Sequence, residues 1–269
     1  MLVNPLPRSQ RIAVLSDGSC VPAGSDLNSV LAGHTRWLQD RGFDSRTAQL
    51  SDDDLDALAD ALTATRDQGS IVYLVHTRAQ RAEWIRQALE GAGHAVVTDS
   101  DLRAVVAAAC VLTELRRTGH PISHSAVVVA GSDEVVEMVS LLMAIGVRNL
   151  TSWTQADAPQ MPLARIAQDA DMVVELRNAP VQDPHTPSQS PPVVVRLPAL
   201  TDCLAVLPGL LVALADTTAK RLHVDVLAAV AQLLATTAEP DTALATPDTA
   251  LTDAIAWAAR QALRHPRAG

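Results

Sequence analysis

Short apolar runs alternate along the chain with longer segments in which apolar residues recur every three or four positions. The short runs are typical of strands buried on both faces, and the longer segments are typical of helices with one apolar face. The predicted strands are residues 11–15, 70–75, 95–97, 126–130, 147–152, 171–175 and 193–197. The predicted helices are residues 29–41, 51–62, 78–90, 101–118, 133–145, 210–218, 224–237 and 251–263. This alternation predicts an α/β fold with a largely parallel, doubly wound sheet.

The stretch VVVAGSDEVVEMVSLLMAIGV has the form in which a dinucleotide-binding βα unit begins, with a strand running into Gly131. Such a turn normally carries three glycines, which allow the diphosphate and the helix to approach the backbone closely. Asp133 and Val136 stand where the second and third glycines would be. Gly131, Ser132 and Asp133 are therefore the candidate cofactor-binding residues of a degenerate turn. The carboxylates of Asp133 and Glu134, at the predicted helix N-terminus, would repel a phosphate.

Charge and cysteine content narrow the class of protein. The chain of 269 residues has a formal net charge of −9 and a pI of about 5.3, with a single lysine, Lys220. An acidic chain without a basic run argues against nucleic-acid and anionic-membrane partners. No apolar run reaches the roughly 18 residues of a membrane-spanning helix. The three cysteines lie far apart and the N-terminus lacks an apolar leader, so we expect a reduced, cytoplasmic protein.

Four segments, in this order, resemble the malic enzymes, which are NAD(P)- and metal-dependent oxidative decarboxylases of malate. The family's strand ending in T/S-D-G, followed by a Gly-Lys pair, is matched by Ser16-Asp17-Gly18 and Gly33-His34. The family's H-D-D segment, which leads into an apolar helix, is similar to residues 94–105. Its glycine turn and its P-G segment are similar to residues 127–147 and 205–219. The resemblance covers nearly the whole chain and implies a Rossmann-like domain beside a catalytic domain.

The residues that carry the family's chemistry are replaced. The resemblance places its metal-binding Glu-Asp pair near Leu74-Val75 and its aspartate ligand of H-D-D at Ser100, and hard divalent cations need carboxylate oxygens that these residues lack. The base lysine becomes His34, and the substrate-binding asparagines fall near Asp202. The acid tyrosine belongs to a segment upstream of the first residue. We therefore expect no metal site of the family's kind, and malate oxidation lacks its Lewis acid, base and acid.

A second interpretation is an enzyme with different chemistry at the position of the family's active-site cleft. The resemblance maps five polar residues to the rim of the family's interdomain cleft: His34, His76, Asp99, Asp101 and Asp202. Such a His/Asp cluster could bind a transition metal or perform acid/base catalysis, with His34, Asp99 and Asp202 as catalytic residues. Alternatively, these are polar residues at strand ends, and Asp99 to Asp101 form an N-cap. Shared acid/base work requires His34 and Asp99 to lie within about 10 Å.

Together these observations predict three consecutive segments. A shortened malic-enzyme-like domain spans residues 1–115, a Rossmann-like domain spans 116–237, and residues 238–269 form a linker and a C-terminal helix that packs back on the first domain. The leading hypothesis is a pseudoenzyme without a cofactor that acts by binding or assembly, as a homodimer or with a protein partner. The alternatives are an enzyme with repurposed chemistry and a weak sensor of nucleotides, such as NAD or NADP, or of small carboxylates.

Overall fold

The computed structural model describes residues 11–21, 24–50, 71–177, 192–197, 199–237 and 248–264. The predicted helix at 51–62, most of the loop at 181–192 and most of the linker at 238–248 lie outside these residues. Two compact units can be separated. Unit 1 holds the described parts of Met1–Asp99, Val206–His223 and Pro247–Pro266, and unit 2 holds those of Ser100–Ala205 and Val224–Thr246. Both units are discontinuous in sequence, whereas the predicted domains are consecutive.

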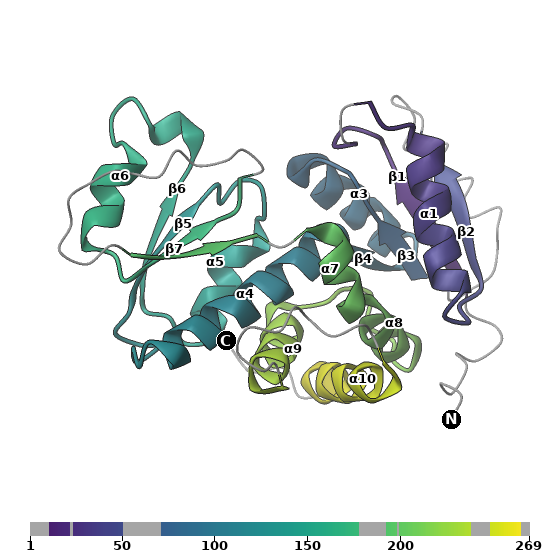
Figure 1. The fold of residues 1–269 in the computed structure, drawn as a ribbon. Helices are drawn as coiled ribbons and strands as arrows, with labels where there is room; N and C mark the ends of the chain where they lie inside the picture. The colour runs from purple at the N-terminus through teal and green to yellow at the C-terminus, as the bar shows by residue number, and fades with distance from the viewer. Residues whose placement is uncertain are drawn as a thin grey trace. The chain divides into compact units, whose positions relative to one another are not determined.

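Unit 1 is built on a four-stranded parallel sheet of order β2-β1-β3-β4 (Figure 1). Its strands are β1 (Ile12–Ser16), β2 (Ser45–Gln49), β3 (Ile71–Leu74) and β4 (Ala95–Thr98). Every residue of β1, β3 and β4 is buried. These strands are apolar along their length because both of their faces are covered, as is usual in parallel sheets.

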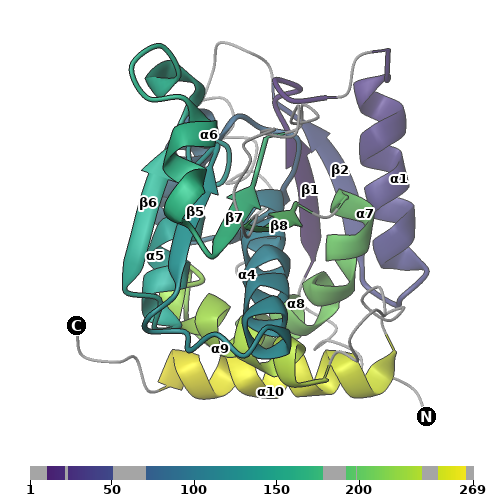
Figure 2. The same ribbon diagram turned by 60° about the vertical axis from the view of Figure 1, so that its left-hand side comes forward.

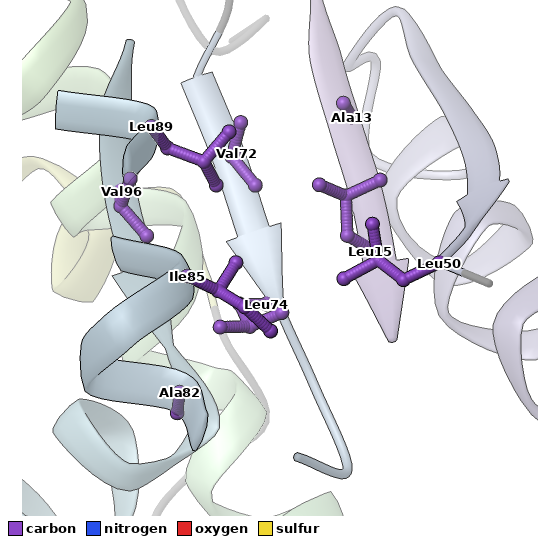
Figure 3. Packing of buried hydrophobic residues seen from close by; sticks show 9 residues of the cluster. All are labelled: Ala13, Leu15, Leu50, Val72, Leu74, Ala82, Ile85, Leu89 and Val96. Carbon is purple, nitrogen blue, oxygen red and sulfur yellow. The ribbon is translucent and has the colours of Figure 1, made fainter. Parts of the chain in front are cut away.

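The helices of unit 1 are α1 (Leu27–Gln39), α3 (Ala79–Gly91), α8 (Leu207–Ala215) and α10 (Thr249–Arg264). Figure 3 shows one cluster of the core, in which β1, β3 and β4 meet one face of α3. Its members are Ala13, Leu15, Leu50, Val72, Leu74, Ala82, Ile85, Leu89 and Val96. The spacing Ala82, Ile85 and Leu89 on α3 is the helical period that the sequence pattern predicts.

Helices α8 and α10 lie against each other through a glycine contact. A Cβ atom placed on Gly209 of α8 would lie 2.5 Å from Cβ of Ile255 on α10 and 2.9 Å from the carbonyl oxygen of Thr252. The absence of a side chain at Gly209 therefore sets how closely the two helices approach.

Unit 2 repeats the same strand order, β6-β5-β7-β8, again all parallel (Figure 2). The strands are β5 (Ala126–Ala130), β6 (Asn149–Trp153), β7 (Met172–Glu175) and β8 (Val193–Arg196). Its helices are α4 (Asp99–Arg117, which belongs to this unit from Ser100), α5 (Glu137–Ala144), α6 (Leu163–Ile166), α7 (Leu200–Cys203) and α9 (Val224–Thr237). The three short 3₁₀ segments are η1 (Gln155–Asp157), η2 (Ala167–Asp169) and η3 (Leu204–Val206).

The predicted α/β class with parallel sheets is confirmed, but the observed elements differ locally, as in the helix predicted at 210–218, which spans Leu207–Ala215. The strand β2 was not predicted, because its sequence SRTAQ contains no apolar run. Helix α5 begins at Glu137, not at Asp133, since residues 131–136 form turns. Asp133 and Glu134 therefore precede the helix and do not form its N-terminus. No helix in the described ranges is long and apolar enough to cross a membrane.

Candidate functional site

In both units the strand order places a topological switch point at the carboxyl edge of the sheet. In unit 1 the chain winds from β1 to β2 on one side and to β3 on the other, and in unit 2 from β5 to β6 and to β7. Ligands of open parallel sheets bind at such points, just beyond the carboxyl ends of the strands. The residues that follow these strands are therefore the candidate site residues of each unit.

In unit 1 the loops after β1 and β3 are bonded to each other. Asp17 accepts hydrogen bonds at Oδ1 from the backbone N–H and the hydroxyl of Ser19, at 2.9 and 2.8 Å. Oδ2 of Asp17 forms an ion pair with Nε of Arg81 on α3, at 2.8 Å. The hydroxyl of Ser19 accepts the backbone N–H of Arg78, and the N–H of Cys20 donates to the carbonyl of His76. This edge of the sheet is thus held in one arrangement by its own polar groups.

Two histidines face each other at this edge. Nε2 of His34, on α1, lies 3.3 Å from Nε2 of His76, which follows β3. The ring of His34 also meets the edge of Tyr73, with the ring centroids 5.7 Å apart. Helix α1 fixes His34 because the neighbouring Leu31 and Thr35 are buried beneath it. The two imidazoles share a hydrogen bond whose donor depends on the tautomers.

His76 has a strained backbone that Asp99 supports. Its φ of 51° is the one positive φ at a residue other than glycine within the described ranges. Oδ2 of Asp99, the first residue of α4, accepts the backbone N–H of His76 at 2.9 Å. Strained backbone outside glycine is uncommon and often occurs at functional sites.

Burial changes the acid–base behaviour of His34. Loss of hydration, with a smaller contribution from the nearby charge of His76, lowers the pKa of His34 from 6.5 to about 4. His34 is therefore neutral at physiological pH. Each of its ring nitrogens then acts either as a donor or as an acceptor.

The predicted catalytic residues do not all meet within one unit. His34 and Asp99 both lie at the carboxyl edge of unit 1 and are linked through His76. Asp202 is an exposed residue of α7 in unit 2, and Asp101 is buried in α4. The catalytic roles of His34, Asp99 and Asp202 stay a prediction.

In unit 2 the turn after β5 is engaged with the neighbouring strands. Gly131 has a φ of 81°, and its N–H donates to the carbonyl of Trp153, at the end of β6, at 2.8 Å. The N–H of Ser132 points to the same oxygen at 3.5 Å. Asp133 is exposed in the turn that follows. These contacts tie the turn after β5 to the end of β6.

Arg177, two residues beyond β7, lies over Gly131. A Cβ atom at position 131 would come within 2.6 Å of Cγ of Arg177. The guanidinium of Arg177 binds the buried carboxylate of Glu175 through Nε at 2.7 Å and through Nη2 at 2.8 Å, and these bonds raise the pKa of Arg177. The same guanidinium lies 4.9 Å from the ring centroid of Trp153 and donates to Gln155.

The sequence reasoning did not single out Arg177 or the partner of Asp17. A signal for Arg177 does exist in the sequence. Glu175 ends an apolar, buried-type strand, and a charge at such a place needs a nearby partner of opposite sign. Asp17 and Arg81 lie far apart in the sequence and on different elements, so no local sequence pattern indicates that they form an ion pair.

The two parallel sheets with flanking helices define a doubly wound α/β protein, and solved structures of the same fold are found among the malic enzymes. The NAD-dependent malic enzyme of Thermotoga maritima matches with a TM-score of 0.74 and 18% identity, over 94% of this chain and 84% of that chain. The malic enzyme of Pyrococcus horikoshii matches with a TM-score of 0.72 and 15% identity, over 96% and 77%. That of Entamoeba histolytica matches with a TM-score of 0.73 and 14% identity, over 96% and 70%.

The chain therefore has the malic-enzyme fold, as the sequence resemblance predicts. No protein-family model matches the sequence, and no curated relative does either.

The residues at the turn of unit 2 do not fit a dinucleotide diphosphate. Asp133 stands at the second glycine of the fingerprint, the position that allows the backbone to approach a diphosphate closely, and the turn at Gly131 is packed against Arg177. The turn is followed by the exposed carboxylates of Asp133 and Glu134, which repel a phosphate.

The positions that match the family's metal ligands do not fit a hard divalent cation either. Leu74 and Val75 are fully buried and apolar. The hydroxyl of Ser100 donates to Oε2 of Glu137 at 2.8 Å. Among the described residues, no three His, Cys, Asp or Glu side chains are grouped so that they could hold a metal ion.

Proposed function

We propose that this protein has the malic-enzyme fold without malic-enzyme chemistry, and that it acts in the cytoplasm by binding or assembly. The observation that carries the proposal is the turn after β5, which packs Gly131 against Arg177 and presents the exposed carboxylates of Asp133 and Glu134. The replacement of the expected metal ligands by Leu74, Val75 and Ser100 supports it independently. Two separate requirements of malate oxidation, a cofactor site and a cation site, are thus changed at once.

Dinucleotide binding tests this proposal. We expect no saturable heat when NADH or NADPH is titrated into the purified protein by isothermal calorimetry, because the turn is filled and acidic. The matched variant is Asp133→Asn, which removes an exposed charge from the turn and leaves its contacts with β6 in place. Saturable binding of NADH that becomes tighter in Asp133→Asn would identify a working diphosphate site and contradict the proposal.

For the assembly part of the proposal, we expect a homodimer or a stable complex with another protein. Light scattering coupled to size exclusion measures the mass of the purified chain directly. A mass of twice the 28.4 kDa of one chain is the expected result for self-assembly. A protein that is monomeric and with which no protein partner copurifies from its native cells would contradict an assembly role.

The runner-up is an enzyme with repurposed chemistry, and the edge of unit 1 favours it. His34 lies beside His76, and Asp99 supports the backbone of His76, so two imidazoles stand at the edge where a polar ligand would bind and exchange a proton. A thermal-shift screen of small carboxylates and nucleotides tests this candidate and the sensor alternative, because a ligand of the native state raises the melting temperature. A ligand that raises the melting temperature of His34→Gln as much as that of the wild type does not bind at this edge of unit 1.

A further inference from the structure

The facing imidazoles of His34 and His76 are not used by the proposed function. Their Nε2 atoms lie 3.3 Å apart, and their ring centroids 5.4 Å apart. The near contact of two ring nitrogens can be satisfied in two ways. Either one nitrogen donates a proton to the other, or both direct their lone pairs at one cation.

We propose that His34 and His76 together bind one transition-metal ion of the Zn²⁺ class. Zinc–nitrogen bonds of about 2.0–2.1 Å at a tetrahedral angle place two ligand nitrogens about 3.3 Å apart. The observed separation therefore already suits two ligands of one ion, and the rings need only turn so that their lone pairs converge. The ion replaces the proton shared by the two nitrogens, and the displaced proton moves to Nδ1 of its ring.

Both ligands are held by the fold before any ion arrives. His34 stands on α1, whose buried face anchors the helix. The backbone of His76 is fixed on both sides, since its N–H donates to Asp99 and its carbonyl accepts from Cys20. Both residues are half-buried. The backbone of His76 is strained, with a φ of 51°, and is hydrogen-bonded on both sides. This arrangement is expected where the fold holds a side chain in one orientation.

The chemistry of the pair selects the kind of ion. Imidazole suits Zn²⁺, Cu²⁺ and Ni²⁺, whereas Mg²⁺ and Ca²⁺ prefer carboxylate and carbonyl oxygens. With two protein ligands, water completes the coordination, so the ion exchanges readily and an open position is left for a ligand. This site does not depend on the proposed function, because the pair lies in unit 1 and the dinucleotide turn lies in unit 2.

Zinc binding by the full chain tests the proposal. Chelator-treated protein is titrated with Zn²⁺ by calorimetry, and its melting temperature is followed with and without the ion. We expect one Zn²⁺ per chain and a higher melting temperature, because the ion binds only the folded pair. His34→Gln and His76→Asn are each expected to weaken binding by about tenfold or more. Asparagine is chosen at position 76 because it tolerates a positive φ.

The matched control is His120→Gln, which removes an exposed histidine outside the pair and is expected to leave zinc binding unchanged. Cooperative thermal unfolding of each variant shows that a loss of binding is not a loss of fold. Absence of Zn²⁺ binding by the wild type would overturn the proposal. So would equal binding by wild type and His34→Gln, or an equal response to Mg²⁺.

Discussion

His34 shows how burial of one side chain sets a property of the folded protein. The imidazole lies against His76 and the edge of Tyr73, and its charged form is disfavoured by lost hydration. The folded chain therefore protonates His34 only near pH 4, while the unfolded chain does so near pH 6.5. Between these values the unfolded state binds more protons, so acid favours unfolding.

Metal-free protein should consequently lose stability as the pH falls from about 6.5 to about 4. A difference of about 2.5 units corresponds to a loss of about 3 kcal/mol in the free energy of unfolding. Denaturant unfolding at several pH values measures this loss. It should shrink in His34→Gln and persist in His120→Gln. An NMR titration that finds the pKa of His34 near its ordinary value would contradict this explanation.

Two factors oppose a side chain at position 131, and comparison with Gly119 distinguishes their effects. Its φ of 81° disfavours any side chain, and a Cβ atom would also meet Arg177. Gly119 has a similar φ of 72°, but no atom lies within 4 Å of the place of its Cβ. A side chain at position 131, but not one at position 119, should therefore clash with Arg177.

Gly119→Ala should lower the free energy of unfolding by about 1 kcal/mol through backbone strain alone. Gly131→Ala should lower it by about 1–3 kcal/mol more, because Arg177 must shift. Denaturant unfolding of both variants measures the difference. Equal losses would show that Arg177 does not press on the turn.

At the scale of elements, the contact of α8 with α10 gives a similar paired test. Gly209 lies in helix α8 without a positive φ, and the neighbouring helix occupies the place of its Cβ. Gly33 lies in the exposed interior of α1, with no atom within 4 Å of its Cβ position. Helix propensity alone would favour alanine at both sites.

Gly33→Ala should raise the free energy of unfolding by about 0.5–1 kcal/mol. Gly209→Ala should instead lower it by about 1–2 kcal/mol, because overpacking against Ile255 exceeds the gain in propensity. Thermal or denaturant unfolding distinguishes the two signs. Stabilisation by both variants would mean that α8 and α10 do not pack as closely as described.

The sequence predicted the elements best where burial leaves an apolar signature. The apolar strands β1, β3, β5 and β7 were predicted close to their observed bounds. The edge strand β2 has polar residues, and an edge position does not demand an apolar run on both faces, so the pattern missed it. The start of α5 was placed too early because Asp133 and Glu134 are typical of a helix N-terminus, although they lie in a turn.

The candidate site was less accessible from the sequence. Local pattern and the resemblance point to the glycine turn and to His34 as a candidate residue. The contact of His34 with His76 joins positions 42 apart, and the ion pair of Arg81 with Asp17 joins two different elements. Pairings of this kind depend on how strands and helices are brought together, which hydrophobic periodicity does not encode.

At the scale of the whole molecule, the fold and the chemistry of the malic enzymes are separate properties. The chain matches malic-enzyme structures with TM-scores of 0.72 to 0.74 over most of its length. Gly131 is packed against Arg177, and the positions that the resemblance matches to metal ligands are apolar or a serine hydroxyl. A fold can persist with other side chains at its functional edges, because packing and catalysis place different demands on the sequence.

The most direct test of this account is malate-dependent reduction of NAD and NADP, followed by absorbance, with purified protein and saturating Mn²⁺ or Mg²⁺. We predict no rate above that of a protein-free blank with either cofactor and either cation. Reproducible turnover that scales with protein concentration, survives further purification and changes in Asp133→Asn would contradict the account.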